Sequence, residues 1–174
     1  MSGSLLLWLT LAMLVFWAVG LYNRLMRMRA RAFGAMGSVE KHLREYIELT
    51  LELTVNAQGE SVSQGNLLPA ELEILDRALK DARQKPLAIE PMARLQQAVT
   101  ALQRGWEGLL ALPVDLAGPA IPEHMQARWS AIAHQVETSR NDYNQILHEY
   151  NESVTQFPAR LIVGLLGVKP GGRL

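Results

Sequence analysis

The first 23 residues of the chain carry no charged side chain, and this run limits the possible folds more than any other feature of the sequence. Residues 5–22 are almost wholly apolar (LLLWLTLAMLVFWAVGLY). A helix needs about 20 such residues to cross the hydrocarbon core of a bilayer. Trp8, Trp17 and Tyr22 belong to the residue types that favour the membrane–water interface. The run therefore predicts a transmembrane anchor over residues 1–23.

A cleaved signal peptide is the alternative interpretation of the same run. Such a peptide starts with basic residues, has a shorter apolar core and ends at a small-residue cleavage site. Here no Lys or Arg precedes the run. The basic residues follow it, with no acid before Glu40: Arg24, Arg27, Arg29 and Arg31. Because basic residues beside a membrane helix tend to stay in the cytoplasm, we predict a single-pass protein of the cell membrane with its N-terminus outside and the rest of the chain in the cytoplasm.

The charge balance and the lack of cysteine exclude several classes of function. The chain has 174 residues, with 17 basic and 17 acidic side chains and no Cys. A balanced charge gives no electrostatic footprint for nucleic acid. Because of this balance we expect no nucleic-acid partner. Without Cys there is neither a disulfide framework nor a thiolate metal site.

No motif of a catalytic or metal site fits the sequence. The segment HEYNE (148–152) lacks the second His of the zinc motif HExxH, and no His has a Glu three residues before it, as di-iron helical bundles require. The segment GLLGVKP (164–170) lacks the spacing of a phosphate-binding loop. We predict no catalytic residue, metal or cofactor and a protein that is not an enzyme, and we identify no small-molecule substrate. An enzyme that uses dispersed residues is the remaining alternative.

Beyond the anchor, the apolar residues recur at helical spacing throughout. The expected helices run from the membrane to about Asn56, from Pro69 to Lys85, from about Pro91 to Pro113, and from about Pro122 to Phe157. Polar, glycine-containing residues at 56–66 predict a loop. In the last helix the apolar stripe is a strict heptad: Met125, Trp129, Ile132, Val136, Ser139, Tyr143, Ile146, Tyr150, Ser153 and Phe157.

The lengths of these helices predict their arrangement. Short connections favour antiparallel neighbours, and at about 1.5 Å per residue the last helix matches the cytoplasmic part of the first. We therefore predict an all-α fold, in which the transmembrane helix continues into one long helix of an antiparallel up-down-up-down four-helix bundle. The domains are the anchor at 1–23, the bundle at 24–157 and an apolar, basic tail at 158–174. This tail either lies on the lipid surface or caps the bundle.

One dipeptide, Tyr-Asn, recurs at both ends of the chain. Three of the four tyrosines are followed by Asn: Tyr22-Asn23, Tyr143-Asn144 and Tyr150-Asn151. The last two tyrosines fall on the heptad stripe, and the Asn residues fall at its edge. A buried Asn can fix the register of paired helices, so we expect Asn144 and Asn151 to set the pairing with the first helix. The tyrosine stripe is either packed core or a groove for a partner.

Two segments resemble the LemA family. Its members follow the membrane helix with YNxLVxLRNxVxxAWxxIDVQLKRR and end with a segment like ARxxYNxxVxxYNxxIxxFPxxLxAxxFGF. Residues 22–49 read YNRLMRMRARAFGAMGSVEKHLREYIEL, and residues 139–170 read SRNDYNQILHEYNESVTQFPARLIVGLLGVKP. The residues that carry this resemblance most clearly are Tyr22, Asn23, Arg140, Tyr143, Asn144, Tyr150, Asn151, Phe157 and Pro158. Residues 56–138 resemble the family only as helices, and Met36 stands where the family has Trp.

The resemblance implies a helical bundle anchored in the membrane, with the Tyr-Asn pairs at two ends of the chain that meet near the bilayer. The family has no established molecular activity. We therefore expect a membrane-anchored scaffold or interaction protein that binds an unknown protein or itself. The alternative is a module that binds anionic lipid through residues 158–174 and the four arginines Arg24, Arg27, Arg29 and Arg31.

Overall fold

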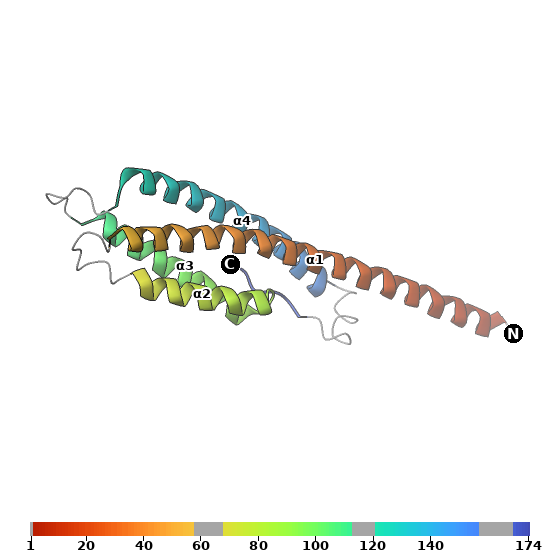
Figure 1. Ribbon diagram of the computed structural model, residues 1–174. Helices are drawn as coiled ribbons and strands as arrows, with labels where there is room; N and C mark the ends of the chain where they lie inside the picture. The colour runs from red at the N-terminus through yellow and green to blue at the C-terminus, as the bar shows by residue number, and fades with distance from the viewer. Residues whose placement is uncertain (1, 58–67, 113–120, 157–168) are drawn as a thin grey trace.

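The structure, a computed structural model, describes residues 2–57, 68–112, 121–156 and 169–174. These residues form four helices and no strand: α1 (Ser2–Ala57), α2 (Leu68–Gln84), α3 (Ile89–Leu110) and α4 (Glu123–Thr155) (Figure 1). The all-α prediction is confirmed, and the predicted helices agree with the observed ones to within a few residues.

Helix α1 is continuous because no proline interrupts it, and it protrudes far beyond the other elements at its N-terminal end (Figure 1). Its protruding part exposes large apolar side chains, including Leu7, Trp8 and Phe16. It is the one helix in the described ranges that is long and apolar enough to cross a membrane. The segment predicted as the anchor is therefore an unburied apolar helix that runs directly into the bundle.

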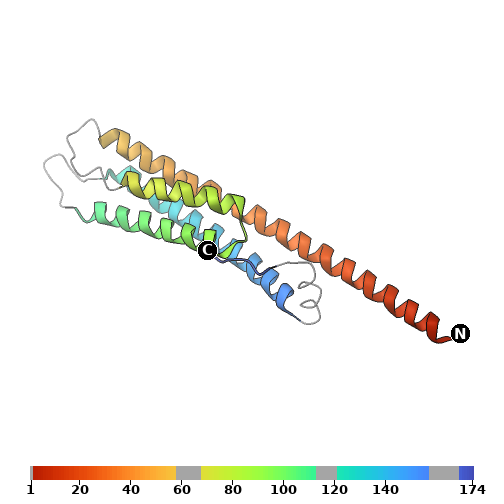
Figure 2. The same ribbon diagram turned by 90° about the horizontal axis from the view of Figure 1, so that it is seen from below.

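The bundle consists of two antiparallel helix pairs. Helix α4 runs back along α1, and α2 packs on α3 (Figure 2). The α1–α4 contacts step in opposite directions along the two helices: Glu52 pairs with Arg128 at 2.7 Å, and the His42 ring lies 3.3 Å from the Ser139 hydroxyl. This register brings the C-terminal end of α4 back to the part of α1 that follows the apolar run.

An aromatic cluster joins the two pairs at the end of the bundle far from the apolar helix. The Trp129 ring of α4 stacks on Trp106 of α3 with centroids 4.0 Å apart, and it meets the Tyr46 ring of α1 at 4.2 Å. Trp106 and Tyr46 are fully buried. Large rings that stack inside a core contribute more than their buried area alone, so this cluster ties α1, α3 and α4 together.

The predicted apolar stripes of the first three helices form the core. They are buried throughout: Met36, Val39, Leu43, Tyr46 and Leu53 in α1, Leu68, Leu72, Leu75, Leu79 and Ala82 in α2, and Met92, Leu95, Val99, Leu102, Trp106 and Leu109 in α3.

The strict heptad predicted for the fourth helix is wrong beyond Tyr143. Tyr150 is buried as the heptad predicts, but the other buried residues there are Leu147 and Val154, whereas Ile146 and Ser153 are partly exposed. An α-helix has 3.6 residues per turn, so a straight helix drifts away from a 3.5-residue repeat by about 20° per heptad. After several heptads the drift moves the buried face by one position.

The last six described residues form a fifth element of the bundle. Residues 169–174 form neither helix nor strand and run beside α4 and the α2–α3 turn, where the Gly172 amide donates to the Leu87 carbonyl at 3.0 Å (Figure 1). Gly171, Gly172 and Leu174 are buried. The remainder of the predicted tail, together with Phe157, lies outside the described residues.

Candidate functional site

The site with the most directional contacts is the groove that holds residues 169–174, which we call the tail groove. Its floor is α4, and its far wall is the α2–α3 turn with the first turn of α3. Asn151 makes two hydrogen bonds to one residue of the tail: its side-chain amide donates to the Gly171 carbonyl at 3.0 Å, and its oxygen accepts from the Gly171 amide at 2.7 Å. One side chain thereby satisfies both backbone groups of Gly171.

Asn144 repeats this arrangement one heptad earlier. Its amide donates to the Leu174 backbone oxygen at 2.5 Å, and its oxygen accepts from the Leu174 amide at 2.9 Å. Two Asn seven residues apart on a helix are separated by about 10.5 Å along its axis. Three residues of extended chain cover about 10 Å. The distance between the two Asn along α4 therefore matches the distance between Gly171 and Leu174 along an extended tail.

The two tyrosines before these asparagines hold the same segment. The Tyr143 hydroxyl lies 2.8 Å from the Pro86 carbonyl and 3.1 Å from the Gly172 carbonyl, within reach of donating to either. The Tyr150 hydroxyl donates to the Lys169 carbonyl at 3.2 Å. Burial raises the pKa of both phenols. The polar groups of the groove thus bind backbone groups of the tail, while the side chains of Lys169 and Arg173 are exposed to solvent.

Two glycines let the tail lie this deep. A Cβ at Gly172 would lie 2.5 Å from Ile89 Cα and 3.1 Å from the Ala88 carbonyl oxygen, both of them backbone atoms. A Cβ at Gly171 would lie 2.4 Å from the end of the Leu147 side chain. No larger residue fits at 172 unless α3 or the tail moves. Pro170 has no amide hydrogen and a fixed φ, which disfavours a helix through the tail itself.

Leu174 anchors the tail from inside the bundle. Its side chain is 6 % exposed and lines a small cavity with residues of α1, α3 and α4, among them Leu43, Leu95 and Arg140. Arg140 is partly buried and pairs with Glu137 at 3.3 Å. Its Nε is buried without a hydrogen-bond partner among the described residues.

The predicted motif residues separate into three groups. Tyr143, Asn144, Tyr150 and Asn151 form the tail groove, and Arg140 lines the small cavity beside Leu174. Tyr22 is half-exposed and lines a second cleft together with Tyr150, while Asn23 is exposed. Phe157 and Pro158 lie outside the described residues. The expectation that Asn144 and Asn151 set the register against the first helix is wrong, because both side chains bond to the tail.

The membrane-flanking arginines do not form one patch. All four are exposed. Arg29 lies on the face of α1 that lines the second cleft, whereas Arg31 lines a groove between α1 and α4. At 100° per residue, Arg24 and Arg27 fall on the same side of α1 as Arg31. The four arginines, which are neighbours in the sequence, therefore lie on two different sides of α1.

The sequence did contain a signal for the tail groove. Lys-Pro-Gly-Gly-Arg-Leu ends the chain with a helix breaker and two residues without side chains, which predicts an extended segment that tolerates close approach. What the sequence did not show is that this segment lies against the Tyr-Asn stripe.

Within the described ranges, no group of three His, Asp or Glu side chains could hold a metal ion.

One of three comparisons with known proteins agrees with the resemblance found in the sequence. A search of curated proteins and a search of solved structures returned no match. A sequence model of the LemA family matches residues 35–173, which include the helical bundle, the Tyr-Asn pairs of α4 and all but the last residue of the tail. The chain belongs to the LemA family.

Proposed function

We propose that this protein is a membrane-anchored, non-catalytic scaffold of the LemA type, and that copies of it associate by exchanging their C-terminal tails. The observation that carries the proposal is the tail groove. Four side chains of α4 direct their polar groups at the backbone of one extended hexapeptide, and that hexapeptide is shown to fit. A second copy supplies the same hexapeptide.

The chain has the length needed for such an exchange. Residues 157–168 connect α4 to the tail, and twelve residues can span at most about 40 Å when extended. A helical bundle is narrower than this, since packed helices lie about 8–10 Å apart. Copies fixed side by side in one membrane would meet at high effective concentration. Exchange of an identical element requires no new contacts, which favours self-association over an unrelated partner.

Two variants of the full chain test the exchange. Asn144→Ala with Asn151→Ala removes the bonds that hold a tail, and Gly172→Ala makes a tail that does not fit. We expect wild-type copies carrying two different tags to co-purify from membranes. Two groove-deficient copies should not co-purify, nor should two tail-deficient copies. A groove-deficient copy mixed with a tail-deficient copy should co-purify, because one intact tail meets one intact groove.

A peptide experiment checks the groove by itself. A chain that ends at residue 168 should bind a labelled KPGGRL peptide, measured by fluorescence anisotropy, and a KPAARL peptide is the control for the two glycines. Equal binding of both peptides would contradict the groove. Undiminished co-purification of groove-deficient copies would show that association uses another surface.

A further inference from the structure

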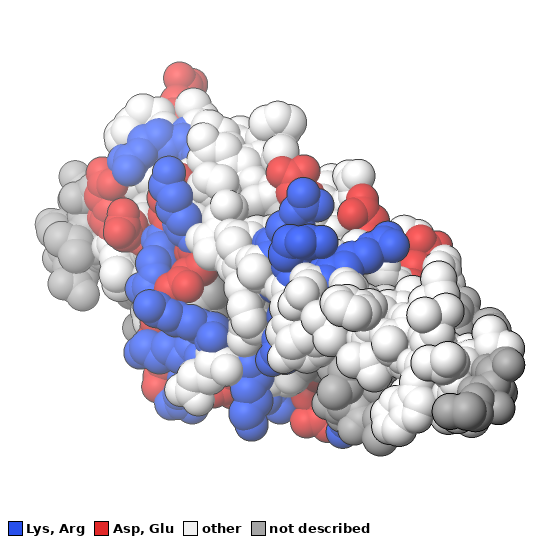
Figure 3. Space-filling model, turned by 90° about the vertical axis from the view of Figure 1, so that its right-hand side faces the viewer, with Lys and Arg blue, Asp and Glu red and all other residues white. Residues whose placement is uncertain are grey.

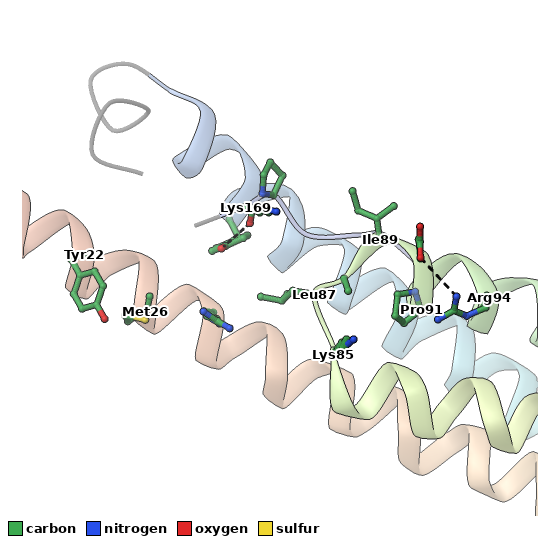
Figure 4. Close-up of a pocket in the computed structure, with 13 residues that line it drawn as sticks. Tyr22, Met26, Lys85, Leu87, Ile89, Pro91, Arg94 and Lys169 are labelled. Atoms are coloured by element: carbon green, nitrogen blue, oxygen red, sulfur yellow. Dashed lines mark hydrogen bonds and ion pairs between the residues drawn. The ribbon is translucent and has the colours of Figure 1, made fainter. Parts of the chain in front are cut away.

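A second cleft, of about 870 Å³, opens beside α1 where the bundle begins. One wall is α1, with Tyr22, Met26 and Arg29 (Figure 4). These three positions are separated by four and three residues and therefore share one face of the helix. The opposite wall is the α2–α3 turn with the start of α3, and the tail closes the cleft with Lys169 and Pro170. We call this the basal cleft.

The basal cleft gathers positive charge from four parts of the chain. Its basic residues are Arg29 of α1, Lys85 of the turn, Arg94 of α3 and Lys169 of the tail, and its single acidic residue is Glu90. Arg94 already faces Asp81 at 3.6 Å and Glu90 at 3.9 Å. Within the described residues, Arg29, Lys85 and Lys169 make no ion pair. Like charges collected in one cleft repel each other, and an anion between them would relieve that repulsion.

The backbone adds to this field. The first turn of α3 lines the cleft, and its N-cap residue, Ala88, provides no side-chain cap. The N-terminal end of a helix carries a partial positive charge. The cationic side chains define the site, and the helix end contributes a potential of the same sign.

The position of the cleft points to the source of the anion. Tyr22 is the last residue of the apolar run and also lines the cleft. From Tyr22 to Arg29 the helix rises about 10 Å, which is comparable to the depth of a lipid headgroup region. Viewed from the side toward which α1 protrudes, Lys and Arg side chains gather beside the uncharged helix, with Asp and Glu side chains among them (Figure 3). The cations therefore lie where phosphates of the adjoining leaflet would be.

The lining also contains apolar surface. Leu87, Pro91 and Pro170 surround the charges, and Ile89 is 64 % exposed at the rim. A small soluble anion would leave these side chains in water. A molecule that joins a phosphate to acyl chains would cover them.

We propose that the basal cleft binds the phosphate of an anionic phospholipid headgroup in the leaflet next to the bundle. This inference rests on the membrane anchoring in the proposed function, and it does not depend on exchange of tails. It assigns to Arg29, Lys85 and Lys169 a task that the tail groove leaves open, since the groove uses only the backbone of Lys169.

The chain offers a matched pair of charge variants. The cleft variant carries Arg29→Gln, Lys85→Gln and Lys169→Gln. The control variant carries Arg24→Gln, Arg27→Gln and Arg31→Gln, which removes the same charge from the other side of α1 near the same depth. All six residues are exposed, so neither variant removes core packing. Circular-dichroism melting of both variants checks that the fold is retained.

Native mass spectrometry of the full chain in neutral detergent measures lipid binding directly. Phosphatidylglycerol is the anionic probe, phosphatidylcholine is the zwitterionic probe, and glycerol 3-phosphate is the soluble one. We expect the wild type to retain phosphatidylglycerol in preference to phosphatidylcholine. The cleft variant should lose at least about tenfold in affinity for phosphatidylglycerol, since each basic residue at a membrane surface contributes about 1 kcal/mol. The control variant should change by less than about twofold, because exposed charges farther from the site are screened.

Three results would overturn the inference. Equal losses in the two variants would mean a diffuse electrostatic attraction without a site. Equal retention of the two phospholipids would mean that negative charge is not recognised. Binding of glycerol 3-phosphate as tight as that of phosphatidylglycerol would identify a soluble phosphate as the ligand. Because this measurement is made in detergent, its failure is separate from failure of membrane anchoring, which extraction of membranes with alkaline carbonate tests.

Discussion

At Gly172 the backbone of the tail approaches the backbone of α3 so closely that a methyl group has no room. Its added Cβ would meet Ile89 Cα at 2.5 Å, and a helix backbone does not rotate away as a side chain does. Position 172 therefore requires glycine because there is no space for a side chain. Gly171 differs, because its added Cβ would meet the movable end of Leu147.

Gly172→Ala should destabilise the protein by about 1–3 kcal/mol, the usual cost of forcing an extra methyl into a packed site. Urea unfolding of the full chain in detergent measures this cost. Gly108→Ala is the matched control, because Gly108 is exposed in α3 and an added Cβ there meets nothing within 4 Å. That control should be neutral or more stable by up to about 1 kcal/mol, since Ala favours helix more than Gly. Equal effects of the two substitutions would place the tail outside the groove.

Buried phenols give the protein a predictable loss of stability in alkali. Burial raises the pKa of Tyr143, Tyr150 and Tyr46 above the usual value for tyrosine. The unfolded chain then releases these protons at lower pH than the folded chain, so the unfolded state binds fewer protons. Stability is complete below about pH 10 and falls as the pH rises further, by about 1.4 kcal/mol per pH unit for each such phenol.

Tyr143→Phe should make this alkaline loss less steep, while lowering stability at neutral pH through the lost bonds to the Pro86 and Gly172 carbonyls. Urea unfolding of both proteins at a series of pH values from 8 upward checks the slopes. Parallel curves would show that the Tyr143 phenol is not protected from ionisation by the fold.

At the scale of the element, the helix α4 was predicted correctly, but part of its buried face was predicted wrongly. The apolar residues up to Tyr143 are separated by three and four residues in alternation, and both a heptad and a straight helix fit them. Beyond that point the two repeats separate. Leu147 is fully buried, whereas Ile146 is partly exposed and borders the groove between α1 and α4.

Leu147→Ala should cost about 2–5 kcal/mol, the range for a leucine truncated in a core. Ile146→Ala removes as many carbon atoms from a partly exposed position and should cost about 1 kcal/mol or less, as most surface substitutions do. Thermal melting of the two variants beside the wild type compares them. A greater loss for Ile146→Ala would restore the strict heptad.

At the scale of the whole molecule, one continuous helix contains both the apolar segment predicted to be the membrane anchor and one wall of the bundle. Among the described residues, the apolar part of α1 is unburied except near its end, where Leu21 packs against the core, and the part from Leu25 onward is packed against α4. Because the helix is continuous, a membrane crossed by its apolar part would hold the bundle at a fixed distance from the bilayer. The basal cleft lies at that junction, and the aromatic cluster lies at the opposite end.

The predicted orientation can be read with single cysteines, since the natural chain has none. Ser130→Cys, on an exposed position of α4, should react with a membrane-impermeant maleimide only after cells are permeabilised. Ser4→Cys, before the apolar run, should react in intact cells. Reaction of Ser130→Cys in intact cells would reverse the topology. Loss of the Ser4→Cys label together with a smaller mass would identify a cleaved signal peptide.

The sequence by itself determined the four helices, because helix periodicity, proline and glycine act locally and are written in neighbouring residues. It determined the apolar stripes of α1, α2 and α3 for the same reason, and it shows the two Tyr-Asn pairs of α4 one heptad apart. Tertiary structure alone decided what those two pairs bind. The partners of Asn144 and Asn151 lie twenty or more residues away, in a hexapeptide without periodicity. No local rule connects α4 with residues 169–174, because their contact exists only after α4 has packed along α1 with the start of α3 beside it. The basal cleft depends on the same closure, since its cations come from four separate parts of the chain and meet only in the folded bundle.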